Sequence, residues 1–172
     1  KKKILLAKNS ISYETDPYKL FEWITDTKPK KIKLKNLPYR YQMVANNVIN
    51  DSKSTNYHSL SYALKEAKNF FKGLNFVLIV CGDPKKENFR NISLHEPEEV
   101  FIFGVHSKDI DKCINHPKKT MMSSLSQTLE TIYKQRTTKN ILFSPGYPSG
   151  KDFNNFKERG EHFNLLLKNY IS

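Results

Sequence analysis

The sequence has few of the features that mark secreted, membrane or metal-binding proteins. Its 172 residues contain only two cysteines, which is too few for a disulfide framework and favours a reducing compartment. No apolar run approaches the ~20 residues that a bilayer-spanning helix needs. The start of the chain, Lys1 to Ala7, shows neither an initiating Met nor a signal-peptide pattern. We therefore expect a soluble cytoplasmic chain with no membrane partner, and a piece of a longer protein.

Standard nucleotide and metal motifs are also missing. No Gly-x-Gly-x-x-Gly occurs, and the segment Gly146 to Asp152 is one residue short of a P-loop and has Asp where Ser or Thr must reach magnesium. Only Cys113-x-x-His116 has the spacing of a ligand pair, which falls short of the four ligands that zinc requires. We expect neither a metal site nor a catalytic residue within this chain.

Positive charge is what the sequence has in excess. Lysine and arginine number 29 against 17 aspartates and glutamates, a formal charge of +12. This balance favours an anionic partner such as a nucleotide, a phosphosugar, a nucleic acid or an acidic lipid. A lysine-rich solvated surface would give the same charge. Because there is no Lys/Arg-dense recognition helix and no aromatic RNA-binding motif, a nucleic-acid-binding domain is a hypothesis from charge alone.

The pattern of the chain predicts an attached segment followed by one main domain. Residues 1–35 are expected to form a strand at 4–7, a helix at 16–27 and a lysine-rich linker, so they are a boundary segment or the end of a preceding domain. In residues 36–172 strands alternate with helices, which predicts an α/β fold with a mostly parallel sheet flanked by helices. The expected strands lie at 39–45, 47–50, 76–80, 100–105, 120–122 and 141–143.

Apolar stripes predict four helices over this sheet. One carries Leu60 to Phe71, one Ile110 to Ile114, one Leu125 to Tyr133, and the last spans about 152–169. A capping box is expected ahead of the third helix, formed by Ser124 and Gln127. The last helix has four residues on one face: Phe153, Phe156, Gly160 and Phe163.

Three polar loops follow expected strands. They are Asp51–Asn56, Gly82–Asn88 and Ser144–Lys151. Each loop alone is more typical of a solvated turn. If the strands run parallel, however, the loops converge at the sheet edge where α/β proteins bind ligands and where helix N-termini attract anions.

The side chains of these loops suit a small dicarboxylate beside a nucleotide. Lys53 and Lys85 carry positive charge for a carboxylate or a phosphate, and Thr55 and Ser149 offer hydroxyls. Asp51 suits a ribose or an amine. The prediction depends on the three loops meeting in space.

Four motifs, in this order, resemble the C-terminal domain of the Mur ligases. They are Asn36-Leu-Pro-Tyr-Arg40, Ile49–Asn56, Cys81-Gly-Asp-Pro-Lys85, and Ser144–Ser149 followed by Phe153-x-x-Phe156-x-x-Arg-Gly160. The Asp-Ser-Lys-x-Thr-Asn element is similar to that of the members that add D-glutamate to UDP-N-acetylmuramoyl-L-alanine. The resemblance covers residues 36–170 and implies a Rossmann-like three-layer domain.

The resemblance also implies a function. In the family, ATP phosphorylates the carboxylate of UDP-N-acetylmuramoyl-L-alanine, and the amine of D-glutamate attacks the acyl phosphate during cytoplasmic peptidoglycan synthesis. ATP and Mg²⁺ are bound mainly by upstream domains, so this domain alone is expected to be inactive. By motif position, Arg40 and Asp51 would contact the nucleotide. Five residues would hold D-glutamate: Lys53, Thr55, Lys85, Ser149 and the backbone of Phe156.

Some positions depart from the family pattern. Asn36 stands where Gly is usual, and Pro84 stiffens a loop that reads Gly-Gly-Asp-Gly-Lys in the family. Residues 1–35 do not match the end of the family's central domain. The alternative hypothesis is therefore a non-catalytic Mur-ligase-like module that binds a nucleotide, an acidic ligand or a protein partner.

Overall fold

The computed structural model of the chain describes residues 16–28, 30, 37–86 and 91–171. They fall in two units, residues 1–36 and 37–172. In the first unit, helix α1 spans Asp16–Thr25, two residues short of the predicted end, because Asp26 adopts a left-handed backbone with φ of 54°. The predicted strand at 4–7 and most of the predicted lysine-rich linker lie outside the described residues.

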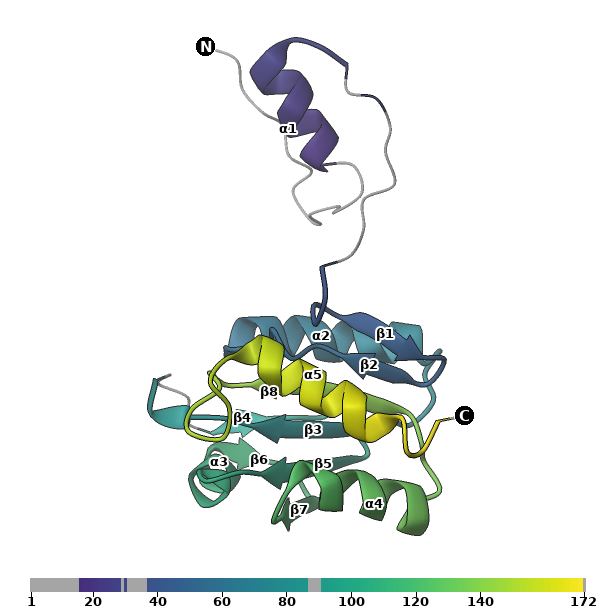
Figure 1. Cartoon of the computed structure of the whole chain (residues 1–172), viewed down its shortest axis with the longest axis vertical. Helices are drawn as coiled ribbons and strands as arrows, with labels where there is room; N and C mark the ends of the chain where they lie inside the picture. The colour runs from purple at the N-terminus through teal and green to yellow at the C-terminus, as the bar shows by residue number, and fades with distance from the viewer. Residues whose placement is uncertain (1–15, 29, 31–36, 87–90, 172) are drawn as a thin grey trace. The chain divides into compact units, whose positions relative to one another are not determined.

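The second unit is built on a six-stranded sheet in the order β1-β2-β8-β3-β5-β7, which descends from β1 to β7 in Figure 1. Neighbouring strands are parallel except β1 and β2, which are antiparallel. This confirms the predicted α/β fold with a mostly parallel sheet. The strands are β1 Gln42–Ala45, β2 Val48–Asn50, β3 Val77–Cys81, β5 Glu99–Phe103, β7 Lys119–Met122 and β8 Ile141–Gly146, with a separate parallel pair of β4 Ile92–Ser93 and β6 Ile114–Asn115.

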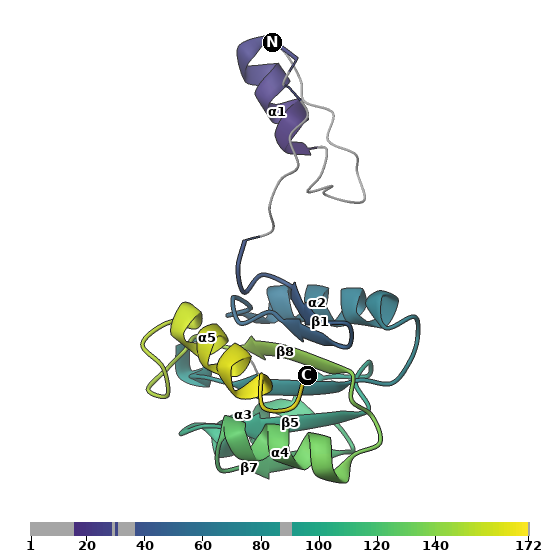
Figure 2. The same cartoon turned by 45° about the vertical axis from the view of Figure 1, so that its right-hand side comes forward.

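Helices cover both faces of the sheet, and α4 and α5 lie in front of it in Figure 2. Alternate residues of each central strand point to opposite faces, so Leu78 and Val80 of β3 join one buried cluster while Val77 and Ile79 join the other. The result is the three-layer arrangement expected from sequence. The helices are α2 Tyr57–Phe70, α3 Ser107–Cys113, α4 Leu125–Gln135 and α5 Phe156–Leu167, with a short 3₁₀ turn, η1, at Pro84–Lys86.

The strand β8 is longer than predicted. It continues through Ser144, Pro145 and Gly146, although a proline cannot donate to a strand ladder. The ladder allows this because pairing with β2 ends at Phe143, and pairing with β3 shifts register before Gly146. The expected turn therefore begins only at Tyr147.

The helix α5 begins later than predicted, at Phe156 rather than Asp152. Asn155 sets this start, because its side-chain oxygen accepts from the backbone N–H groups of Lys157 at 2.9 Å and Glu158 at 3.0 Å. Phe153 precedes the helix and still packs against the second core cluster.

Three smaller predictions also differ from the structure. Ile114 lies in strand β6 rather than in a helix, and Val105 follows β5 with a 65% exposed side chain. The capping box of α4 is only half formed. Ser124 accepts from the backbone N–H of Gln127 at 3.1 Å, but the Gln127 side chain bonds Ser123 instead.

Candidate functional site

Loops leave the five parallel strands at the same edge of the sheet, its carboxyl edge, and four of them bear on the site. We name them by the strand that each follows: the β2 loop (51–56), the β3 loop (82–86), the β5 loop (104–106) and the β8 loop (147–155). Because β2, β8, β3 and β5 are parallel neighbours, their loops start side by side. The sequence predicted the convergence of three of these loops but not the presence of the β5 loop.

The β3 and β8 loops are in direct backbone contact. The N–H of Asp83 donates to the carbonyl of Pro148 at 2.8 Å. Gly82 has φ of 121°, and a Cβ on it would lie 2.2 Å from that same carbonyl oxygen, so only glycine fits there. The contact brings the loop of Lys85 against the loop of Ser149, as the sequence predicted.

The β2 loop is tied to the end of β8. The N–H of Gly146 donates to the carbonyl of Ser54 at 3.1 Å, and the N–H of Asp51 donates to the carbonyl of Phe143 at 2.7 Å. Thr55 directly follows Ser54 in the chain. The loops of Thr55, Lys85 and Ser149 therefore share one rim, as their predicted common site requires.

Lys53 and Phe156 come together across the site. The Nζ atom of Lys53 lies 4.0 Å from the centroid of the Phe156 ring, a cation–π contact worth ~0.5–2 kcal/mol. The hydroxyl of Ser52 donates to the Phe156 carbonyl at 2.8 Å. A carbonyl cannot bind an anion, and the N–H groups of Lys157 and Glu158 are bonded by Asn155. A carboxylate at the start of α5 would therefore have to meet the N–H of Phe156.

The accessibility of the predicted site residues suits a charged small molecule. Lys85 is exposed, and its backbone N–H is anchored by the Asp83 carboxylate at 3.0 Å. Thr55 and Ser149 are partly buried. The edge thus offers an accessible ammonium beside sheltered hydroxyls, which is the donor set that orients carboxylates.

Asp51 is less open than its predicted nucleotide contact requires. It is 8% exposed, and its two carboxylate oxygens accept from the Tyr41 N–H at 2.9 Å and the Ser144 hydroxyl at 3.0 Å. Burial raises the pKa of Asp51 to about 6, although these bonds and the charges of Arg40 and Arg159 act in the opposite direction. Asp51 therefore braces the residue before β1 against β8, whereas the Arg40 side chain is exposed.

Comparison with known proteins shows which family the chain resembles. No family model matches the chain. Proteins named UDP-N-acetylmuramoylalanine--D-glutamate ligase are similar to it. The one from Petrotoga mobilis is 32% identical over 145 residues, covering 78% of this chain and 32% of the relative. The chain is related to the Mur ligases. Those from Buchnera aphidicola and Hydrogenobaculum sp. are 35% and 33% identical, covering 77% and 79% of this chain but 31% and 34% of their own lengths.

This relationship confirms the family expected from the four motifs. The chain spans about a third of the length of the Mur ligases that it matches. Within the described residues, no group of three or more His, Cys, Asp or Glu side chains is placed to hold a metal ion. None of the helices described is long and apolar enough to cross a bilayer.

Arg159 belongs to the fourth motif of this Mur ligase relative, but its position in the sequence predicts no role for it. The structure places it beneath the site, fully buried. The only sequence signal is a charged residue between Phe156 and Phe163 on the apolar face of α5, and such a residue usually reaches solvent with its charged end.

The β5 loop is a second feature that sequence reasoning missed. The N–H of Val105 donates to the Asp152 carboxylate of the β8 loop at 2.9 Å. His106 lies with its Nε2 atom 3.8 Å from an Asp83 carboxylate oxygen. These contacts join residues about 20 to 50 positions apart, and no local motif announces them.

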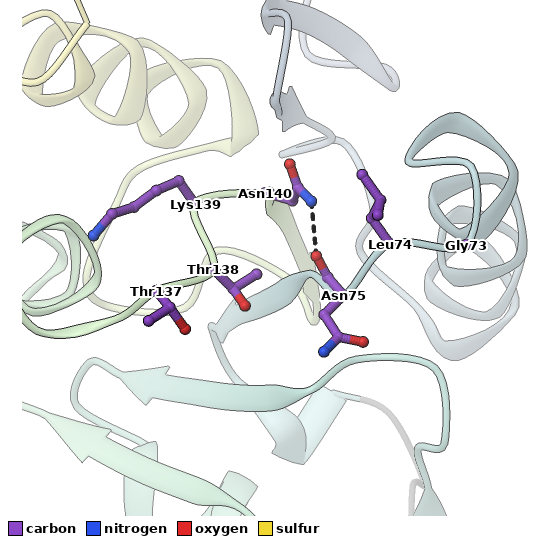
Figure 3. A pocket seen from close by; sticks show the side chains of 7 residues that line it. All are labelled: Gly73, Leu74, Asn75, Thr137, Thr138, Lys139 and Asn140. Atoms are coloured by element: carbon purple, nitrogen blue, oxygen red, sulfur yellow. Dashed lines mark hydrogen bonds between the residues drawn. The ribbon is translucent and has the colours of Figure 1, made fainter.

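A hollow of about 520 Å³ lies at the opposite edge, near the amino ends of β3 and β8 (Figure 3). Two of its polar side chains, Asn140 and Lys139, donate to backbone carbonyls of the fold. The Asn140 side chain donates to the carbonyl of Asn75 at 2.8 Å, and Lys139 donates to three carbonyls near the end of α4. These two side chains are therefore already engaged and are not available to a ligand in the hollow. It is lined by Gly73, Leu74, Asn75, Thr137, Thr138, Lys139 and Asn140.

Proposed function

We propose that residues 37–172 form the C-terminal domain of a ligase that adds D-glutamate to UDP-N-acetylmuramoyl-L-alanine. The observation that carries this proposal is the meeting of the β2, β3 and β8 loops at one sheet edge. These loops hold Thr55, Lys85 and Ser149, the residues assigned to D-glutamate by motif position. The relatives named as such ligases support the same assignment.

The chemistry of the edge supports binding of an amino-acid dicarboxylate. The ammonium groups of Lys53 and Lys85 oppose the charge of two carboxylates, and the hydroxyls of Thr55 and Ser149 fix their orientation. Holding the carboxylates in this way would present the amine of the ligand to an acyl phosphate on the partner substrate. Orientation of this kind is a large part of catalysis in bond-forming enzymes.

The nucleotide contact in this proposal rests mainly on Arg40. Its exposed guanidinium suits a phosphate oxygen. Asp51 suits a ribose hydroxyl only if one of its bonds to Tyr41 or Ser144 opens. ATP with Mg²⁺ supplies the activation of the carboxylate, and in this proposal both are held mainly by other domains of the ligase.

The activity belongs to the whole ligase in this proposal. The 172-residue chain alone is expected to show no ligation, because phosphoryl transfer needs a phosphate and magnesium cradle. Its partners are the upstream ligase domains, ATP, D-glutamate and UDP-N-acetylmuramoyl-L-alanine, and its compartment is the cytoplasm. Ligation of D-glutamate by the 172-residue chain would contradict this part of the proposal.

Kinetics of the whole ligase test the site. Lys85→Ala and Ser149→Ala are each expected to raise the KM for D-glutamate, by ~10-fold to ~100-fold for the lysine, because a charge-assisted hydrogen bond is lost. Lys134→Ala is the matched control, since Lys134 is an exposed lysine that pairs with Glu130 on α4. An unchanged KM in both site variants would contradict the assignment and favour the binding-module alternative.

A further inference from the structure

Arg159 is the largest fully buried side chain of the described residues. It lies near the start of α5, under the carboxyl edge of the sheet. A buried guanidinium is costly unless its donors are bonded. The hydrogen bonds of Arg159 therefore show which segments it connects.

The guanidinium bonds the loops that follow two parallel strands, β2 and β8. Its Nε and Nη2 atoms donate to the hydroxyl and the carbonyl of Ser52 at 3.1 and 2.8 Å, and its Nη1 atom donates to the carbonyl of Tyr147 at 3.1 Å. The thiol of Cys81, at the end of β3, lies close enough to act on the charge of the guanidinium. One side chain thus bonds the β2 and β8 loops, and the β3 loop is joined to the β8 loop by the bond from Asp83 to Pro148.

The acceptors around Arg159 are neutral. Among the described residues, no carboxylate forms an ion pair with it, although Asp51 and Asp152 are close enough to act on its charge. A carbonyl or hydroxyl accepts along a definite direction, and a planar guanidinium presents its donors at fixed angles. The bonding pattern therefore fixes geometry more than it neutralises charge.

We propose that Arg159 is a positioning residue whose planar guanidinium sets the spacing of the three loops that carry Lys53 and Thr55, Lys85, and Ser149. The proposal rests on the proposed function in one respect, the identity of the ligand as D-glutamate. The effect on the loops does not depend on that identity. A lysine at this position keeps the charge and can still bond carbonyls, but its donors leave one atom and lack the rigid planar fork, so it cannot hold Ser52 and Tyr147 at the same spacing.

Hydrogen exchange of the 172-residue chain tests the effect on the loops. Arg159→Lys is expected to speed exchange of the Asp83 and Gly146 amides, which bridge the loops, about tenfold relative to Val77. The Val77 amide bonds Asn140 at the other edge, so the ratio removes any general loss of stability. Arg136→Lys is the control, because Arg136 pairs with Glu99 at 2.7 Å and contacts none of these loops.

Kinetics of the whole ligase test the consequence for the site. Arg159→Lys is expected to raise the KM for D-glutamate about tenfold while kcat changes less than about threefold. The KM for ATP should stay unchanged, and Arg136→Lys should leave all three parameters unchanged. A fall in kcat and in protein yield with no change in KM would show a purely structural role and overturn the proposal.

The two measurements separate the failure of this inference from that of the proposed function. If the wild-type whole ligase does not ligate D-glutamate, the proposed function fails, and hydrogen exchange still decides the role of Arg159. If Arg159→Lys does not fold, Ser52→Ala decides, because it removes one acceptor and keeps the guanidinium. Loop exchange that matches the wild type in the variant that folds, or equal effects in Arg136→Lys, overturns the proposal.

Discussion

The two edges of the sheet differ in how their loops are held. At the carboxyl edge, loops from separate strands bond each other through backbone groups and share the buried Arg159. At the amino edge, a hollow of about 520 Å³ is lined by residues that include Lys139 and Asn140, whose side chains are bonded to backbone carbonyls. The comparison shows that a hollow by itself does not identify a site. Convergence of donors that are still available identifies it.

The largest expected difference between the edges concerns two glycines. Gly82→Ala at the carboxyl edge should cost about 4 kcal/mol, because the new Cβ would meet the Pro148 carbonyl in a strained backbone. Gly73→Ala at the amino edge should cost only about 1 kcal/mol, since φ is 76° but nothing lies within 4 Å of its Cβ. Urea unfolding followed by circular dichroism measures both. Equal costs would show that the carboxyl-edge loops are not tightly packed.

The next prediction concerns the buried carboxylate of Asp51. Burial raises its pKa from an ordinary value of 3.8 to about 6 in the folded chain, so the folded state binds the proton more tightly and this group lowers stability as pH rises from about 4 to about 6. As pH rises from 4 to 7, the free energy of unfolding of Asp51→Asn should therefore increase by about 3 kcal/mol relative to that of the wild type. Unfolding curves at several pH values measure this. A pH-independent difference between the two chains would contradict the burial of the charge.

Glu99, at the amino edge, should behave in the opposite way. Burial alone would raise its pKa, but bonds from Arg136 and Thr120 outweigh burial and lower it. Its contribution to stability is therefore present above the unfolded pKa and is lost as pH falls through the folded pKa. Glu99→Gln should cost about 2 kcal/mol at pH 7 and progressively less in acid, by the same unfolding assay. A cost that grows in acid would reverse the comparison.

The smallest expected effect is at the hollow of the amino edge. Asn140→Ala removes one exposed hydrogen bond to Asn75 and should cost about 0.5–1 kcal/mol. In the whole ligase it should leave the KM for D-glutamate unchanged, in contrast to Lys85→Ala. A shift in that KM as large as the effect of Lys85→Ala would indicate that D-glutamate binds at the amino edge, which would contradict the proposed site at the carboxyl edge.

The sequence predicted the sheet and the meeting of three loops because both follow from local patterns. Unbroken apolar runs such as Phe76 to Val80 predict buried parallel strands, and a polar loop after each strand must lie at one edge. The start of α5 was misplaced because Phe153 continues the helical spacing, whereas the cap that decides the start is Asn155.

The parts that could not be predicted depend on contacts between distant residues. The brace between Asp51 and Ser144 spans 93 positions, and the bonds between Arg159 and Ser52 span 107. The sequence shows that a residue such as Asp51 or Arg159 is charged. It does not show that residues distant in the chain will bury its side chain and hydrogen-bond to it. The roles of the site residues toward D-glutamate and the nucleotide remain predictions that the proposed kinetics can test.

The rate at which the Cys81 thiol reacts can report how often the loops of the carboxyl edge open. It is fully enclosed, and burial raises its pKa to about 11, so at neutral pH it is neither reachable nor ionised for alkylation. A thiol reagent can therefore modify it only while the loops are apart, with the half-buried Cys113 as an internal reference. The rate of labelling at Cys81 would then measure how often the loops separate. A ligand that holds the loops together would lower this rate.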